Sequence, residues 1–138
     1  MVPQLASSTK LLAWFAIING VLAITAPAWW PLLTPQAMPI TGVWIYILTG
    51  LMSLMSGIFG LQAKRWAFLL LFLTFLIQCA DYYSENFFVS FIGPLSLKVG
   101  LILKSPPGWF NVNVLAIVVC VLALRSAVQV SKSETSDA

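Results

Sequence analysis

The sequence predicts an all-α membrane protein, a four-helix transmembrane bundle with an interfacial segment on the outer side between helices three and four. Two observations carry this prediction. Of the 138 residues, 60% are hydrophobic and only 8% are charged, whereas about a quarter of the residues of soluble domains are charged. The apolar residues also form long uncharged runs, and about twenty such residues cross the hydrocarbon layer as one helix. We assign 1–138 to a single integral membrane domain.

The composition also argues against several function classes. The seven basic residues stand singly or as one pair at the ends of apolar runs, which is typical of orientation signals and not of a nucleic-acid surface. The chain has no histidine, the commonest general base and a frequent haem and metal ligand. Cys79 and Cys120 make no metal or redox motif. We therefore expect no cofactor, no metal, no catalytic residues and no nucleic-acid partner.

The first helix is predicted over 11–30. Lys10, the apolar run and the small residues of 26–28 also resemble a cleavable signal peptide. Trp29 and Trp30 favour a retained helix, because tryptophan prefers the membrane interface. Four prolines spaced four residues apart predict a stiff connection over 27–39.

The second helix, predicted over 41–61, carries a stripe of small residues. At a spacing of three and four, such residues share one helix face and let another helix approach closely. Bulky residues, including Leu48 and Leu54, take most of the other side. The partner of the stripe is either another helix of the same chain or a second subunit. The stripe consists of Thr49, Gly50, Ser53, Ser56, Gly57 and Gly60.

The third helix is predicted over 66–82, after Lys64 and Arg65, the densest basic point of the chain. Its outer end would place several polar side chains on one face, as a cation or substrate site or as a helix end that leaves the bilayer. We favour the helix end and expect its acids to be dispensable for folding. The candidate outer polar patch is Gln78, Asp81, Tyr82, Glu85 and Lys98.

Residues 87–103 are apolar but interrupted by Gly93-Pro94 and by Lys98. A lysine at the bilayer centre costs roughly 2.5 kcal/mol or more. We therefore predict an interfacial or partly re-entrant segment. A fifth crossing and a short β-hairpin on the helix ends remain as alternatives.

The last helix is predicted over 109–128, followed by a disordered tail over 131–138. Four crossings predict a multi-pass protein with both termini in the cytoplasm, in the inner membrane of a bacterium. In this arrangement Cys79 lies near the outer surface and Cys120 lies about 16 Å below Trp109. We expect two free thiols that are too far apart for a disulfide.

The length resembles that of the small multidrug transporters, but those carry a glutamate in the first helix and 11–30 has no acid. The order of parts resembles, over helices two and three, that of small four-helix DoxX-like membrane proteins. The resemblance rests on Gly50, Gly57 and Gly60 followed by Lys64-Arg65-Trp66. These features are common in small membrane proteins, so we assign no family and transfer no residue role.

Three functions fit the sequence. The first is a structural or interaction subunit, which acts in the lipid bilayer as a homo-oligomer or within a larger membrane complex. The second is a transporter or channel for a small solute or ion, for which few mid-membrane polar residues, such as Asn19, are available. The third is a membrane enzyme, which no recognised motif supports. We expect the first.

Overall fold

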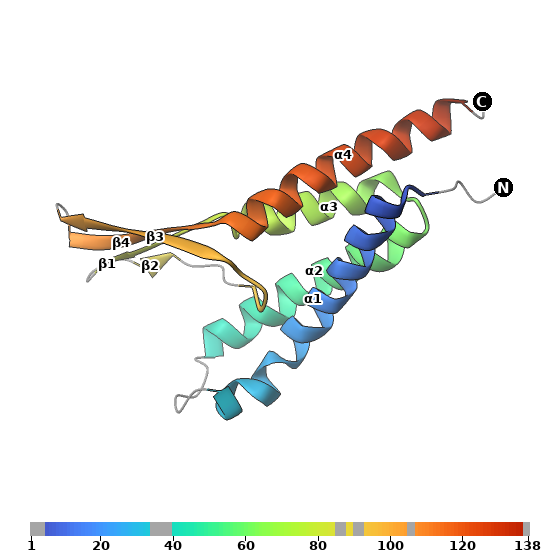
Figure 1. Ribbon diagram of the computed structural model, residues 1–138. Coiled ribbons are helices and arrows are strands. Elements are labelled where there is room, and N and C mark those ends of the chain that lie inside the picture. The colour runs from blue at the N-terminus through green and yellow to red at the C-terminus, as the bar shows by residue number, and fades with distance from the viewer. Residues whose placement is uncertain (1–4, 34–39, 85–87, 90–92, 105–106, 137–138) are drawn as a thin grey trace.

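A computed structural model describes residues 5–33, 40–84, 88–89, 93–104 and 107–136. These residues form four helices and four strands (Figure 1). The order along the chain is α1 (Ser7–Leu33), α2 (Ile40–Leu61), α3 (Arg65–Leu76), β1 (Ala80–Ser84), β2 (Phe88–Val89), β3 (Lys98–Lys104), β4 (Pro107–Asn113) and α4 (Val114–Ser136).

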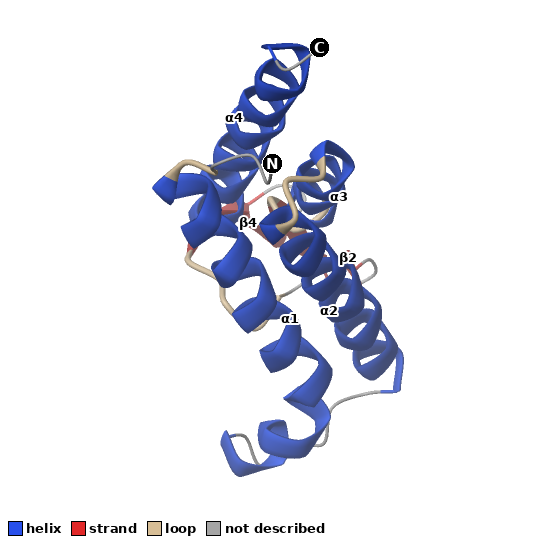
Figure 2. Ribbon diagram, turned by 90° about the vertical axis from the view of Figure 1, so that its right-hand side faces the viewer, coloured by secondary structure: helices blue, strands red, loops and turns tan. Residues whose placement is uncertain are grey.

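The helices pack as two pairs, α1 with α2 and α3 with α4, and α2 also contacts α3. Figure 2 shows α1 and α2 running side by side as long rods. Both chain termini lie at one end of the molecule, and the sheet extends from the opposite end of α3 and α4 (Figure 1). The described part of the chain therefore has a helical end that carries the termini and an end that carries the sheet.

Three of the described helices are long and apolar enough to cross a membrane, namely α1, α2 and residues 114–132 of α4. This is compatible with an integral membrane protein. The helix α3 has only 12 residues and rises about 18 Å, less than the thickness of the hydrocarbon layer. The described helices therefore do not form a uniform bundle of four spanning helices.

The four strands form one antiparallel sheet in the order β2-β1-β4-β3. The helix α3 leads into β1 after three residues, and β4 passes directly into α4. The third helix therefore ends at Leu76 and not at residue 82, and 109–113 is a strand and not the start of the last helix. The described residues of 87–103 contribute β2 and most of β3, so the extended backbone of the hairpin alternative is present but its pairing is not. β2 pairs with β1 and β3 pairs with β4, at opposite edges of the sheet. Tyr82, Tyr83 and the apolar residues of β3 favour extended backbone.

Other predicted boundaries also differ. The helix α1 continues through Pro27 and Pro31, so part of the predicted stiff connection is helical. The helix α4 continues to Ser136, so 131–136 is helical where we expected a disordered tail. The second helix, at 40–61, agrees with its predicted range to one residue.

The main core joins α3 to α4. Large side chains of α3, fully buried, face small residues of α4, so the two helices approach closely while the aromatic rings fill the space between them. The residues are Phe68, Leu71 and Phe75 on α3 with Ala116, Ala123 and Ala127 on α4.

Candidate functional site

The small-residue stripe of α2 lies against α1 within the same chain. All six of its residues are buried. A Cβ atom added to Gly57 would lie 2.7 Å from the carbonyl oxygen of Ala13. A Cβ atom added to Gly20 would lie 2.7 Å from the backbone nitrogen of Leu54. The stripe is therefore used inside the monomer, and Leu54 belongs partly to this contact and not to the opposite side of α2.

Ser53 forms two hydrogen bonds across this helix pair. The hydroxyl of Ser53 donates to the carbonyl of Ala16 at 2.9 Å and accepts from Asn19 Nδ2 at 3.3 Å. The Oδ1 atom of Asn19 is buried and has no hydrogen-bond partner among the described residues. Hydrogen bonds between helices add modestly to packing in membranes, so the contact fixes the register of α1 against α2.

The outer polar residues gather where the helices join the sheet. We call this region the helix–sheet junction and define it as residues 78–81, 97–100 and 111–113. The helix α3 ends in a tight turn, in which the N–H of Gln78 bonds Phe75 and that of Cys79 bonds Leu76. The next carbonyl, that of Cys79, accepts from the N–H of Asn113 at 2.8 Å. The backbone of β1 therefore begins its pairing with β4 directly after the helix.

Asp81 is the centre of the junction. It is buried, forms an ion pair with Lys98 from β3 and accepts a hydrogen bond from Asn111 of β4 at 2.6 Å. Gly100 stands opposite Asn111 in the ladder, and a Cβ atom there would lie 2.6 Å from Asn111 Oδ1. Because Gly100 has no Cβ atom, the side-chain amide of Asn111 has space to reach Asp81. The charge of Asp81 is thus neutralised within the chain, which differs from the exposed helix end that the sequence suggested.

A second asparagine, Asn113, caps α4. Its Oδ1 accepts from the N–H of Ala116 and from the N–H of Leu97, each at 3.2 Å. The N–H of Val114 bonds the carbonyl of Leu97 at 2.8 Å. A side-chain oxygen at this position satisfies a free N–H of the first helical turn. One residue therefore holds the start of α4 to the base of β3.

The other members of the predicted patch take separate places. Gln78 is buried and donates to the carbonyl of Thr74 at 3.0 Å, while its Oε1 has no hydrogen-bond partner in the described part of the chain. Tyr82 is half-buried on β1 and lies opposite Phe110. Glu85 lies outside the described residues. The helical spacing that grouped these residues does not apply, because the helix ends before Gln78.

The thiol of Cys79 in the junction lies close to that of Cys120 on α4. Both are free, as expected, but their sulfur atoms are 3.9 Å apart. The expected separation is wrong because it counted 109–113 and 77–82 as helix.

The junction holds no group of three or more metal-binding side chains among the residues that the structure describes. Its two charged side chains, Asp81 and Lys98, form an ion pair with each other. The sequence analysis did not single out Asn111 and Asn113, although an asparagine directly before an apolar run is a common helix-start signal.

No family model, curated protein or solved structure matches this chain.

Proposed function

We propose that this protein is a small multi-pass membrane subunit that acts structurally, by pairing with a neighbouring polypeptide in the plane of the membrane. The observation that carries the proposal is β3, an apolar strand at the edge of the sheet. Its outer edge has no partner strand among the described residues.

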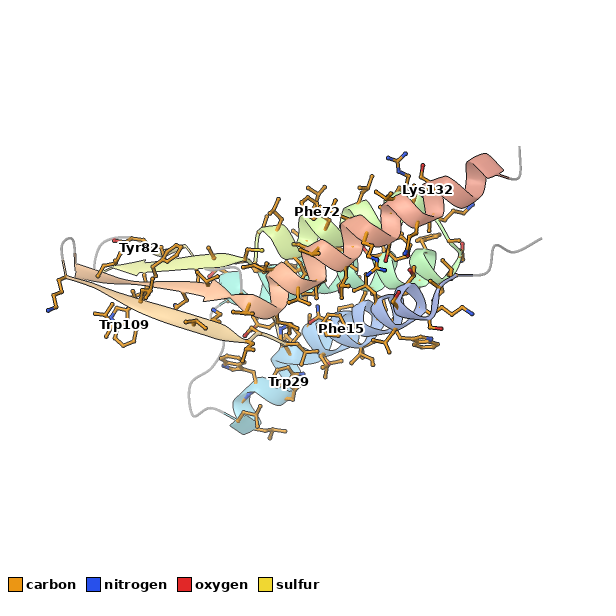
Figure 3. All side chains as sticks on the ribbon, turned by 45° about the horizontal axis from the view of Figure 1, so that its top comes forward. Phe15, Trp29, Phe72, Tyr82, Trp109 and Lys132 are labelled. Atoms are coloured by element: carbon orange, nitrogen blue, oxygen red, sulfur yellow. The ribbon has the colours of Figure 1, made fainter. Side chains whose placement is uncertain are left out.

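Charged and aromatic residues support a position for the bilayer. Lys10, Lys64 and Arg65 lie near the start of α1 and the α2–α3 turn, and Thr9 bonds Ser126, which brings Arg125 to the same end. Trp30 is twenty residues above Lys10 on α1, about 30 Å at the helical rise. Figure 3 shows Lys132 at one end and Tyr82 and Trp109 at the other. We place the basic end in the cytoplasm and the aromatic end outside, in the inner membrane of a bacterium.

In this position the base of the sheet lies within the outer leaflet. The helix α3 rises about 18 Å from the basic end, so roughly 10 Å of hydrocarbon remains above it. At about 3.3 Å per strand residue, that depth takes up the first three or four residues of β3. Lys98 is neutralised there by Asp81, while Lys104 reaches the headgroups.

Exposed apolar side chains on the sheet agree with this depth. Val99, Leu101 and Ile102 are exposed, as is Trp109, which pairs with Ile102 across the ladder. Lipid covers such side chains without cost, but it has no donors or acceptors for the free backbone edge of a strand. An edge at this depth therefore needs a strand from a neighbouring chain, whose N–H and C=O groups complete the ladder.

We take the neighbour to be a second copy of this chain. Both copies insert in the same direction, so two β3 strands that meet at the same depth run parallel and bring the apolar stretch from Val99 to Leu103 of each copy together. The pairing of Lys98 with Asp81 lowers the repulsion between the two Lys98 side chains that this arrangement brings close.

The test is the mass of the purified protein in detergent and in nanodiscs, with Leu101→Pro and Ile102→Pro as a matched pair. Neighbouring residues of an edge strand alternate between pointing the N–H to β4 and to the open edge. Proline is tolerated where the N–H points outward. We expect a dimer for the wild type, and a folded monomer for the one variant whose proline lies on the open edge.

A wild-type monomer with nothing bound would contradict the proposal and favour the alternative, transport of a small solute. A dimer that survives both proline substitutions would contradict the strand edge as the contact. A discrete second protein, released by the outward proline alone, would replace the second copy as the neighbour.

A further inference from the structure

Two cysteines meet across the contact of α3 and α4. Their sulfur atoms are 3.9 Å apart, with Cys79 half-buried and Cys120 buried. Cys79 Sγ donates to the carbonyl of Phe75 at 3.3 Å, and Cys120 Sγ lies 3.6 Å from the carbonyl of Phe72. Both carbonyls belong to α3, so the side chain of Cys120 extends from α4 to the C-terminal turn of α3, next to Cys79.

The backbone sets this approach. The carbonyl of Cys79 accepts from Asn113, and the ladder continues in the next residue, where Ala80 pairs with Val112. Below the thiols, Phe68 and Phe75 pack against the small residues of α4. A disulfide has its sulfur atoms about 2.05 Å apart. The remaining distance is about 2 Å, which is within the range that a rotation of the two side chains covers.

We propose that Cys79 and Cys120 are a redox pair that closes to an intramolecular disulfide by exchange with a disulfide-bearing oxidant. The thiolate of Cys79, the more exposed of the two, attacks one sulfur of the oxidant and expels the other as a thiol. Cys120 gives up its proton and attacks the Cys79 sulfur of this mixed disulfide, expelling the second thiol. The chain loses two protons and two electrons, and the oxidant gains both, as one disulfide becomes two thiols.

The bond would tie α4 to the turn that follows α3, next to the base of the sheet. The cysteines are 41 residues apart, and the segment between them contains all four strands. Closing a loop of this length restricts the unfolded chain, so the oxidised protein unfolds at a higher temperature than the reduced one. The junction thereby becomes sensitive to the redox state of its surroundings. This inference stands on the thiol geometry and is independent of the strand-pairing proposal.

The experiment treats the reduced full-length chain in nanodiscs with 4,4′-dithiodipyridine, an apolar disulfide that releases a coloured thione. Closure releases two thiones per chain and leaves a monomer that has lost two hydrogens and carries no adduct, by intact mass. Cys79→Ser and Cys120→Ser should each release one thione and keep one pyridylthio adduct. Oxidised glutathione serves as a polar second oxidant, and closure by either reagent supports the pair while identifying the route of access.

A wild-type chain that carries two adducts, that reacts with neither reagent and so releases neither thione nor glutathione, or that forms only cross-linked dimers would overturn the proposal. These quantities are measured on the wild-type chain, so they decide the question even if a serine variant fails to fold. Dithiothreitol should restore both thiols, which maleimide labelling after denaturation counts.

Discussion

Asp81 is held by side chains from two other strands, Lys98 of β3 and Asn111 of β4. The side chains of Lys98 and Asp81 are 25% and 10% exposed, so water screens the pair only in part. Removal of one partner leaves the other charge without compensation in a poorly hydrated site, which costs more than the pair itself contributes. We therefore now expect Asp81 to contribute to folding, whereas a helix end in water would make it dispensable.

We expect Asp81→Asn to lower the free energy of unfolding by about 1–3 kcal/mol. The double variant Asp81→Asn with Lys98→Gln should recover most of this loss, because it removes both charges. Thermal unfolding in detergent measures both effects. Equal stability of Asp81→Asn and the wild type would mean that the ion pair makes no net contribution.

The position of the thiols was beyond the reach of sequence reasoning. Cys120 lies in an apolar run and Cys79 follows Gln78 at the end of another, and both stretches fit a helix as well as any other element. Only the pairing of 80–84 with 108–112 places Cys79 beside α4, and such pairing is between segments distant in the chain. The same holds for Asp81 and Lys98, which are 17 residues apart.

The backbones of α1 and α2 approach each other more closely at Gly20 than at Gly60. A Cβ atom at Gly20 would lie within 2.8 Å of two backbone atoms of α2, whereas one at Gly60 would meet only side-chain atoms, at 3.3 Å or more. Backbone cannot yield without moving a whole helix, while the ring of Phe68 beside Gly60 needs to shift only slightly.

This difference predicts the outcome of two identical substitutions. Gly20→Ala should destabilise the protein by about 1–3 kcal/mol through overpacking, despite the better helix propensity of alanine. Gly60→Ala should be neutral or slightly stabilising. Thermal unfolding of the two variants under the same conditions checks this, and a larger loss for Gly60→Ala would show that the helices do not meet at Gly20.

The sequence predicted α2 well because its period and its length both come from local residues. It failed for the outer ends of α3 and α4, where the apolar runs continue from helix into strand without a glycine or proline to mark the change. The only local hints were Tyr82-Tyr83 and the two asparagines of 111–113, which are too few to outweigh a hydrophobic run of spanning length.

At the scale of the whole molecule, α1 and α3 run away from the end that carries the termini, and α2 and α4 run back to it (Figure 1). The termini therefore lie at the same end (Figure 1), together with most of the basic residues. An excess of lysine and arginine marks the cytoplasmic side, so the arrangement and the charge distribution favour the same orientation.

A reporter that is active only in the cytoplasm should work when fused after Ala138, and so should one fused in the α2–α3 turn after Ala63. An exported reporter should be active when it is inserted directly after Leu33 or directly after Lys104, and inactive at the two cytoplasmic positions. Activity of the exported reporter after Ala138 would contradict the paired arrangement, and N-terminal sequencing would then show whether the first segment is cleaved.

The direct passage from strand into helix at Asn113 has a consequence for biosynthesis. As the chain emerges from the ribosome, α3 is too short to be retained as a span by its own hydrophobicity. Its continuation, β1, lacks its main partner until β4 has been made. Because β4 continues directly into α4, β4 becomes available to pair with β1 when the last helix enters the membrane. We therefore expect the C-terminal half to insert in one concerted event, and a chain truncated before residue 114 to give no stable product.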